Sequence, residues 1–299
     1  MTMEINCPHC SEKIEGSRQL IDSCPSCMKP WRQALFASNV KNGNGAGGSG
    51  DTEQDIRDFV VNAFHKAQRD ALWKNSGTRL DTWHVSDFVS PCLRKSHYSK
   101  VPELKTGMND EMAAILFQGV IVHDNSILSS INELTMCYDI VNKCDIDPMT
   151  VRGFDKEDPR KKDILTGTLD DLVKVGDKFV IVDKKTYNAR GYVKKEASPE
   201  HVLQVNIYKL MLKASLGIEA EYGCNLYLDK GDGYKELPMV YKTAEIEETE
   251  KYLTDTLEIF KAGLPDPTIT FLCNGKNKDK KIYCGFYDQC EKDGRDKFV

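Results

Sequence analysis

The chain of 299 residues is 40% hydrophobic and 29% charged, an ordinary composition for one large folded domain with room for a small module. Its net charge of −5 excludes the global basic excess of proteins that bind nucleic acid non-specifically, so any contact with DNA would depend on local patches. The sequence has no run of about 18 apolar residues and no apolar signal segment, so we expect a cytoplasmic protein that does not contact a membrane.

The N-terminal module carries two Cys-x-x-Cys pairs. Tetrahedral zinc takes four thiolates, and two intervening residues let one turn present both sulfurs of a pair to the same ion. Eleven cysteines in a chain without an export signal also favour thiolate ligands over disulfides. A thioredoxin-like redox role for one pair is disfavoured, because there are two pairs and no βαβ pattern around them. We therefore predict a zinc ribbon over residues 1–38, with Zn²⁺ bound by Cys7, Cys10, Cys24 and Cys27.

The ribbon is too short to bury a core, so metal binding is expected to supply most of its folding free energy. Three roles stay open for it: a DNA contact, a protein contact, or a stabilised tail. Residues 39–50 are rich in glycine and are predicted to be a flexible linker, with a reach of about 17 Å by random-coil scaling. Residues 51–299 are predicted to form one domain that begins with an amphipathic helix.

Two acidic strands joined by a tight turn are predicted over residues 164–175 and 179–185. Side chains alternate along a strand, so Asp183 and Lys185 share one face and Lys184 lies on the other. On the first strand, one of the neighbours Asp170 and Asp171 must face that pair. Two carboxylates and a lysine at the end of a hairpin can hold a divalent cation and place a water beside it, although a charged hairpin can also be a solvated edge.

Four short motifs follow one another along the chain. The first is a G-x-x-x-H pattern at Gly119 and His123, and the second is a G-x-x-D pattern at Gly167 and Asp170. The third is a D-x-K-T pattern at Asp183, Lys185 and Thr186, and the fourth is a Q-x-x-x-Y pattern at Gln204 and Tyr208. Each pattern alone is weak. In this order they resemble the PD-(D/E)XK nuclease superfamily, in its RecB-like branch with the CRISPR-associated exonucleases. The resemblance covers roughly residues 86–290.

The resemblance implies an α/β fold in which helices flank a mixed central sheet, as in restriction endonucleases. It also implies that Mg²⁺ or Mn²⁺ is held by His123, Asp170, Asp183 and the carbonyl of Lys184. Lys185 would orient the attacking water, and Gln204 and Tyr208 would position the DNA strand or the lysine. Alternation turns Asp171 away from Asp183, so we expect Asp171→Ala to be far milder than loss of Asp183. The alternative for His123 is a satisfied core histidine.

The segment 86–98 resembles the entry of iron–sulfur members of that branch, in which a serine-capped helix delivers the first cluster cysteine. By that match, a 4Fe–4S cluster is bound by Cys92, Cys273, Cys284 and Cys290. The spacing from Cys284 to Cys290 matches the end of the family's C-x2-C-x5-C pattern, but Lys281 stands where the middle ligand is expected. A zinc site and free thiols without metal stay open as alternatives.

The rest of the chain predicts alternating helices and strands. A helix over 109–130 carries Gly119, whose missing side chain allows close packing against a sheet or a phosphate. One or two strands are predicted over 133–152, with Cys137 and Cys144 as core thiols. Further along we expect a polar loop over 187–198 that contacts either phosphates or solvent, a helix from Pro199, strands over 220–229 and 238–243, and a helix over 244–263.

The resemblance implies a metal-dependent DNA exonuclease that acts at DNA ends or on single strands, in recombination, replication or repair. DNA is the expected partner, and a protein partner of the ribbon is possible in principle. Two alternatives stay open. One is a non-catalytic DNA-binding or assembly protein with structural metal sites, and the other is an endonuclease of the same superfamily.

Overall fold

The structure is a computed structural model that describes residues 3–6, 13–16, 81–104, 116–121, 128–129, 131–188, 194–269, 273 and 284–294. The chain divides into two compact units, Met1–Val60 and Val61–Val299. In the first unit, β1 (Met3–Asn6) and β2 (Lys13–Gly16) form an antiparallel hairpin. The predicted zinc cysteines, the linker, the helix after it and His123 lie outside the described residues, so the ribbon and the domain boundaries stay predictions.

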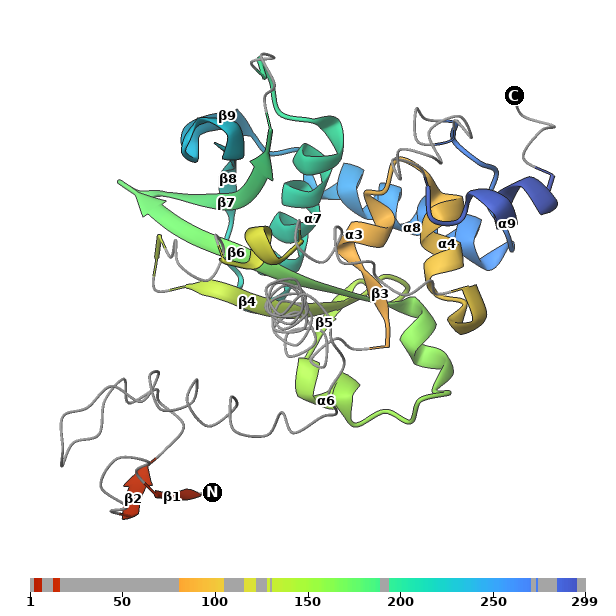
Figure 1. Ribbon diagram of the computed structural model, residues 1–299, viewed down its shortest axis with the longest axis horizontal. Coiled ribbons are helices and arrows are strands. Elements are labelled where there is room, and N and C mark those ends of the chain that lie inside the picture. The colour runs from red at the N-terminus through yellow and green to blue at the C-terminus, as the bar shows by residue number, and fades with distance from the viewer. Residues whose placement is uncertain are drawn as a thin grey trace, which may run out of the picture. The chain divides into compact units, whose positions relative to one another are not determined.

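The described strands of the second unit form a seven-stranded mixed sheet (Figure 1). Its order is β5 (Cys144–Ile146), β4 (Asn132–Asp139), β6 (Ile164–Val175), β7 (Lys178–Tyr187), β8 (Ala220–Asp229) and β9 (Lys235–Lys242), with β3 (Trp83–His84) alongside β6. The pairs β3–β6 and β7–β8 are parallel and the others are antiparallel. Helix α7 (Pro199–Leu216) lies in the connection between β7 and β8, since parallel neighbours need a crossover.

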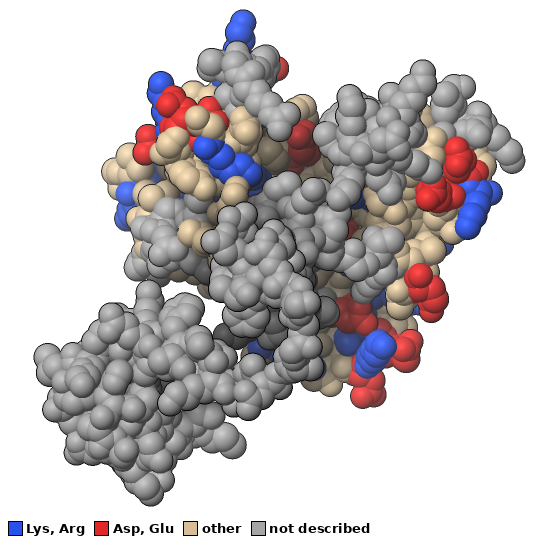
Figure 2. Space-filling view, in the orientation of Figure 1, with Lys and Arg blue, Asp and Glu red and all other residues tan. Residues whose placement is uncertain are grey.

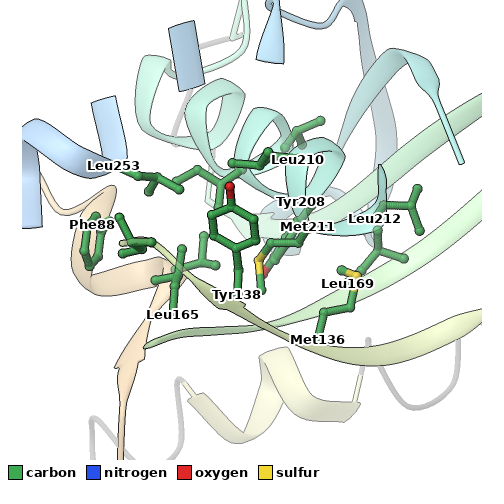
Figure 3. Close-up of a cluster of buried hydrophobic side chains, with 14 of the residues drawn as sticks. Phe88, Met136, Tyr138, Leu165, Leu169, Tyr208, Leu210, Met211, Leu212 and Leu253 are labelled. Atoms are coloured by element: carbon green, nitrogen blue, oxygen red, sulfur yellow. The ribbon is translucent and has the colours of Figure 1, made fainter. Parts of the chain in front are cut away.

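The main hydrophobic core lies between the sheet and three helices, α7, α8 (Ile246–Lys261) and α3 (Val85–Phe88). Trp83 stacks on Phe260 of α8 with ring centroids 4.2 Å apart, which ties α8 to the start of the domain. Full burial of each large apolar side chain stabilises the fold by about 1.5–3 kcal/mol. Figure 3 shows the side chains that meet across this layer, among them Met136, Tyr138, Leu165, Leu169, Tyr208, Leu210, Met211 and Leu212.

A smaller apolar cluster joins α6 (Pro148–Arg152) to the sheet through Cys137, Val151 and Ile164. Ile164 precedes Leu165 of the main core, so alternation along β6 places this cluster on the opposite face of the sheet. Helix α6 begins where the carboxylate of Asp147 accepts the N–H of Met149 at 3.1 Å, with proline at the first helical position. Helices therefore cover both faces.

The C-terminal segment packs on α4 (Leu93–Ser99) through α9 (Tyr287–Lys292). The hydroxyl of Tyr98 donates to Oδ2 of Asp293 at 2.6 Å, and Nε of buried Arg94 donates to the carbonyl of Pro265 at 2.6 Å. Short 3₁₀ helices complete the described elements, η2 (Pro102–Leu104), η3 (Pro159–Asp163) and η4 (Lys230–Asp232).

The predicted fold class is confirmed, because helices flank a mixed sheet. The strand predicted over 220–229 is β8, and the helices predicted from Pro199 and over 244–263 are α7 and α8. The region 133–152 contains α6 as well as strands, and the sequence analysis missed this helix. Cys137 is buried as predicted. The prediction of Cys144 as a core thiol was wrong, because it is exposed on β5 at the edge of the sheet.

In the view of Figure 2, the Lys and Arg side chains of the described residues are interspersed with Asp and Glu, so these residues form no large patch of one charge. Any contact with a phosphate backbone on this face would therefore depend on a few local groups. Among the described helices, none combines the length and the apolar character needed to cross a bilayer.

Candidate active site

The hairpin of β6 and β7 opens at the end farthest from its turn. Its ladder runs from the pair Val175–Lys178, beside a two-residue turn, to the pair Asp171–Val182. Gly176 in the turn has φ = 62°, a left-handed conformation that glycine adopts without strain. Beyond the ladder, the N–H of Lys184 donates to Oδ2 of Asp170 at 2.7 Å. A carboxylate thus lies between the two strands where they separate.

Asp183 lies beside this carboxylate and is 1% exposed. Its Oδ1 accepts from Nζ of Lys185 at 2.9 Å, and its Oδ2 accepts from Nδ2 of Asn225 at 2.9 Å. The hydroxyl of Tyr241 donates to Oδ1 of Asn225 at 2.8 Å and so fixes the amide. Burial raises the pKa of Asp183 to about 6; Lys185 opposes this shift and the charge of Asp170 adds to it. Two buried carboxylates this close favour a cation between them.

Helix α7 carries two polar side chains over the carboxylates. Nε2 of Gln204 donates to the hydroxyl of Tyr208, one helical turn away, at 2.9 Å. Burial raises the pKa of Tyr208, and the charges of Asp183 and Asp170 raise it further. The tyrosine is therefore within electrostatic reach of both carboxylates.

Gly167 lets α7 approach β6, because a Cβ at this position would lie 2.8 Å from the ring of Tyr208 and 2.7 Å from Cγ2 of Val85. We expect Gly167→Ala to lower the free energy of unfolding by about 1–3 kcal/mol through overpacking, and to displace Tyr208 from the carboxylates. Denaturant unfolding of the variant and the natural protein measures this loss.

Gly119 provides the matched control, since a Cβ there would meet no atom of the described residues within 4 Å, apart from the backbone of its own helix. Of the predicted close packing against a sheet or a phosphate, none against the described strands is observed. Gly119→Ala should keep or gain stability, because alanine favours helical backbone. Equal losses of stability in the two variants would contradict the packing argument at Gly167.

Asp171 and Lys184 form an ion pair that is completely buried, with 0% and 1% of their side chains exposed. Nζ of Lys184 lies 2.9 Å from Oδ2 of Asp171, and Oδ1 of Asp171 accepts the N–H groups of Leu128 and Ser129 at 2.9 and 3.1 Å. Asp171 thus pairs away from Lys185, as alternation predicted. The expectation that Asp171→Ala reduces cleavage far less than loss of Asp183 stays a prediction, but this burial adds a cost in stability that the sequence analysis did not foresee. Removing one partner of such a pair costs about 3–5 kcal/mol, because the other charge stays buried.

A further polar group adjoins Lys185, and the sequence analysis did not identify it. The hydroxyl of Tyr227 accepts the N–H of Ser198 at 3.0 Å and forms a second hydrogen bond, 2.8 Å long, with Nδ1 of His201. Burial and the charge of Lys185 lower the pKa of His201 to about 4, so the ring is neutral at physiological pH. Lys194, from the predicted polar loop, lies over the ring of Tyr227 at 4.7 Å.

The predicted cluster cysteines lie around one cavity between α4 and the C-terminal segment. The cavity has about 320 Å³ of space, its mouth included, and its lining contains Cys92, Cys273, Cys284 and Cys290. Burial raises the pKa of the Cys284 thiol, and the nearness of Cys273 and Cys92 adds to this shift. Nη1 of Arg94 donates to Sγ of Cys290 at 3.8 Å.

A comparison with protein families decides the assignment. Residues 138–291 match the family model described as PD-(D/E)XK nuclease superfamily. The chain belongs to this superfamily. A search of curated proteins found no match. Among solved structures, one described as "Crystal structure of SSO0001" has a TM-score of 0.47 and 17% identity, over 78% of this chain and 96% of that chain.

A PD-(D/E)XK nuclease acts on nucleic acid, and such enzymes generally use a divalent metal such as Mg²⁺ or Mn²⁺. In this nuclease, five residues singled out from the sequence come together under α7, namely Asp170, Asp183, Lys185, Gln204 and Tyr208. The sequence analysis missed Asn225, Tyr241, His201 and Tyr227. Asn225 was the detectable one, because it is an amide within residues 223–228 of β8, where every other residue is glycine, cysteine, leucine or tyrosine.

No three His, Cys, Asp or Glu side chains of the described residues converge closely enough to hold one metal ion. At the active site two carboxylates are in place. Of the other predicted ligands, His123 lies outside the described residues and Lys184 would contribute a backbone carbonyl.

Proposed function

We propose that this PD-(D/E)XK nuclease is a metal-dependent DNA exonuclease of the RecB-like branch, acting at DNA ends or on single strands in recombination, replication or repair. The observation that carries the proposal is the buried pair Asp170 and Asp183, with Nζ of Lys185 2.9 Å from Asp183. Carboxylate and carbonyl oxygens suit Mg²⁺ or Mn²⁺, and a divalent cation offsets the repulsion that raises the pKa of Asp183. The donor set therefore fits the metal.

The ion would be held by His123, Asp170, Asp183 and the carbonyl of Lys184. When bound, it supplies Lewis-acid chemistry, because it polarises the scissile phosphate and makes water a stronger acid. Lys185 directs its charge to the place where the phosphate becomes more negative, and it orients the attacking water. Tyr208 accepts a hydrogen bond from Gln204, so its own proton is left to hold an oxygen of the DNA strand.

A time course on DNA labelled at either end, single- or double-stranded, with Mg²⁺ or Mn²⁺, tests the proposal. An exonuclease shortens one end progressively and leaves circular single strands intact. Cleavage of circular DNA would replace the exonuclease with an endonuclease of the superfamily. No cleavage by folded, metal-loaded protein would favour a non-catalytic DNA-binding role.

We also propose that Cys92, Cys273, Cys284 and Cys290 hold a 4Fe–4S cluster. The support is that four cysteines from separate parts of the chain line one cavity. Four cysteine thiolates are the usual ligands of such a cluster. In this position the cluster would join α4 to the C-terminal segment, which Arg94 already holds through Cys290 and Pro265.

The N-terminal unit is expected to be separable from catalysis. A protein that begins at Asp51 should cleave short oligonucleotides at the natural rate, because every residue of the proposed site, from His123 to Tyr241, follows Asp51, and should lose affinity for long DNA or for a partner protein. Rates on short and long substrates, with circular dichroism as the folding control, measure the difference. Loss of turnover on short substrates by the folded variant would place the ribbon in the active site.

A further inference from the structure

The buried ion pair of Asp171 and Lys184 lies directly behind the candidate site. Asp171 follows Asp170 in β6, and Lys184 stands between Asp183 and Lys185 in β7. Neighbours in a strand point to opposite faces, so each partner of the ion pair adjoins a residue of the site through one backbone step. The ladder between the strands ends at the pair Asp171–Val182, so the ion pair marks the place where they separate.

Lys184 is held through both its backbone and its side chain. Its N–H donates to Oδ2 of Asp170 at 2.7 Å, and its Nζ lies 2.9 Å from Oδ2 of Asp171. The hydrogen bond and the ion pair together fix Lys184, the residue whose carbonyl belongs to the proposed metal ligands.

Asp171 also fixes a second segment of chain. Its Oδ1 accepts from the N–H groups of Leu128 and Ser129, and the N–H of Leu172 donates to the carbonyl of Ile131 at 2.9 Å. This segment comes shortly after His123 in the sequence. One side chain therefore connects the separating strands to the segment that follows a further proposed ligand.

Stability does not account for two buried charges at this place. Replacing a buried ion pair by uncharged residues of similar volume is often neutral or stabilising, because the desolvation of the charges offsets their attraction. What the charged pair adds is a defined geometry for the groups that it joins. Partners behind metal ligands typically change metal affinity or activity by about 10–100-fold.

We propose that Asp171 and Lys184 are positioning residues, which hold the strand ends of β6 and β7 so that the carbonyl of Lys184 and the carboxylates of Asp170 and Asp183 converge on the metal. The proposal rests on the proposed function for the identity of the metal. It gives the pair a role in metal binding and turnover without contact to DNA or to the reacting phosphate.

The double variant Asp171→Asn/Lys184→Met tests this, because it removes both charges while the amide oxygen can still accept from Leu128 and Ser129. We expect a melting temperature within a few degrees of the natural protein, an affinity for Mn²⁺ lower by about 10–100-fold, a similar fall in kcat, and an unchanged KM for DNA. Electron paramagnetic resonance of free Mn²⁺ measures the affinity without DNA. The control is Lys251→Met/Asp255→Asn, which removes an exposed pair on α8 and should change nothing.

Natural Mn²⁺ affinity and natural kcat in the folded double variant would overturn the proposal. So would a loss of activity that is fully explained by the unfolded fraction. If the double variant melts below the assay temperature, the Mn²⁺ affinity and kcat of both proteins are measured at a temperature below its melting transition. If the natural protein binds Mn²⁺ but cleaves no DNA, the proposed nuclease function is wrong. The comparison of Mn²⁺ affinities would still show whether Asp171 and Lys184 position the metal ligands.

Discussion

Asp183→Ala and Lys185→Ala are expected to remove DNA cleavage while the fold and DNA binding stay largely intact. Lys185→Ala should lower kcat by about 10²–10³-fold, because it removes a charge directed at the developing negative charge of the phosphate. Asp183→Ala should leave no detectable cleavage, because it removes a carboxylate that would hold the metal and that accepts from Lys185. Asn225 loses an acceptor, which costs about 1–3 kcal/mol, but Lys185 is 23% exposed, so water can solvate its charge in the variant. Cleavage of end-labelled DNA at saturating Mn²⁺ measures the effect.

The matched controls are Asp255→Ala and Lys251→Ala, which change the same residue types in an exposed pair on α8. Both should cleave at the natural rate. DNA affinity is measured on the same preparations, since an inactive variant that also fails to bind DNA would indicate misfolding. Full cleavage by purified Asp183→Ala or Lys185→Ala would contradict the assignment of these residues to the active site.

Alternation along strands predicted the central part of the site, because it depends only on backbone geometry. It placed Asp183 and Lys185 on one face and turned Asp171 away, and the hydrogen bonds agree with both. The G-x-x-D spacing needed more than alternation. Gly167 and Asp170 are an odd number of positions apart, so strict alternation would put them on opposite faces. Yet Tyr208 lies against Gly167, and the charge of Asp170 raises the pKa of Tyr208. On the neighbouring strand β4, Glu133 lies between the paired positions Asn132–Asp171 and Leu134–Leu169. Its φ of 47° marks a backbone irregularity that no sequence pattern predicted.

The residues that were missed depend on tertiary contacts. Asn225 and Tyr241 reach Asp183 only because β8 and β9 pair in their observed register. Lys184 was predicted only as a backbone ligand on the face opposite Asp183 and Lys185, and charged residues are rarely buried unless paired. Its burial follows from a partner on the neighbouring strand. Helix α6 is different, because the aspartate and proline at its start were visible signals that strand periodicity outweighed.

The iron–sulfur assignment leads to the second large effect. Protein purified without oxygen is expected to be brown, with broad absorption near roughly 400 nm from iron–sulfur charge transfer. Cys92→Ala and Cys290→Ala should bleach the colour and destabilise the nuclease domain. The reason is that Cys92 immediately precedes α4 while Cys290 lies in α9, so a shared cluster ties together two segments far apart in the sequence.

Cys137→Ala is the matched control, because Cys137 is equally a cysteine of the domain but is buried in the separate cluster with Val151 and Ile164. It should keep its colour, with at most a loss of stability from the cavity it leaves. Metal analysis should also find zinc, at about one ion per chain, bound in the N-terminal ribbon. Zinc without iron after anaerobic reconstitution would reject the cluster. The nuclease assignment would then stand unchanged, because Asp170, Asp183 and Lys185 belong to strands that the cysteine cavity does not include.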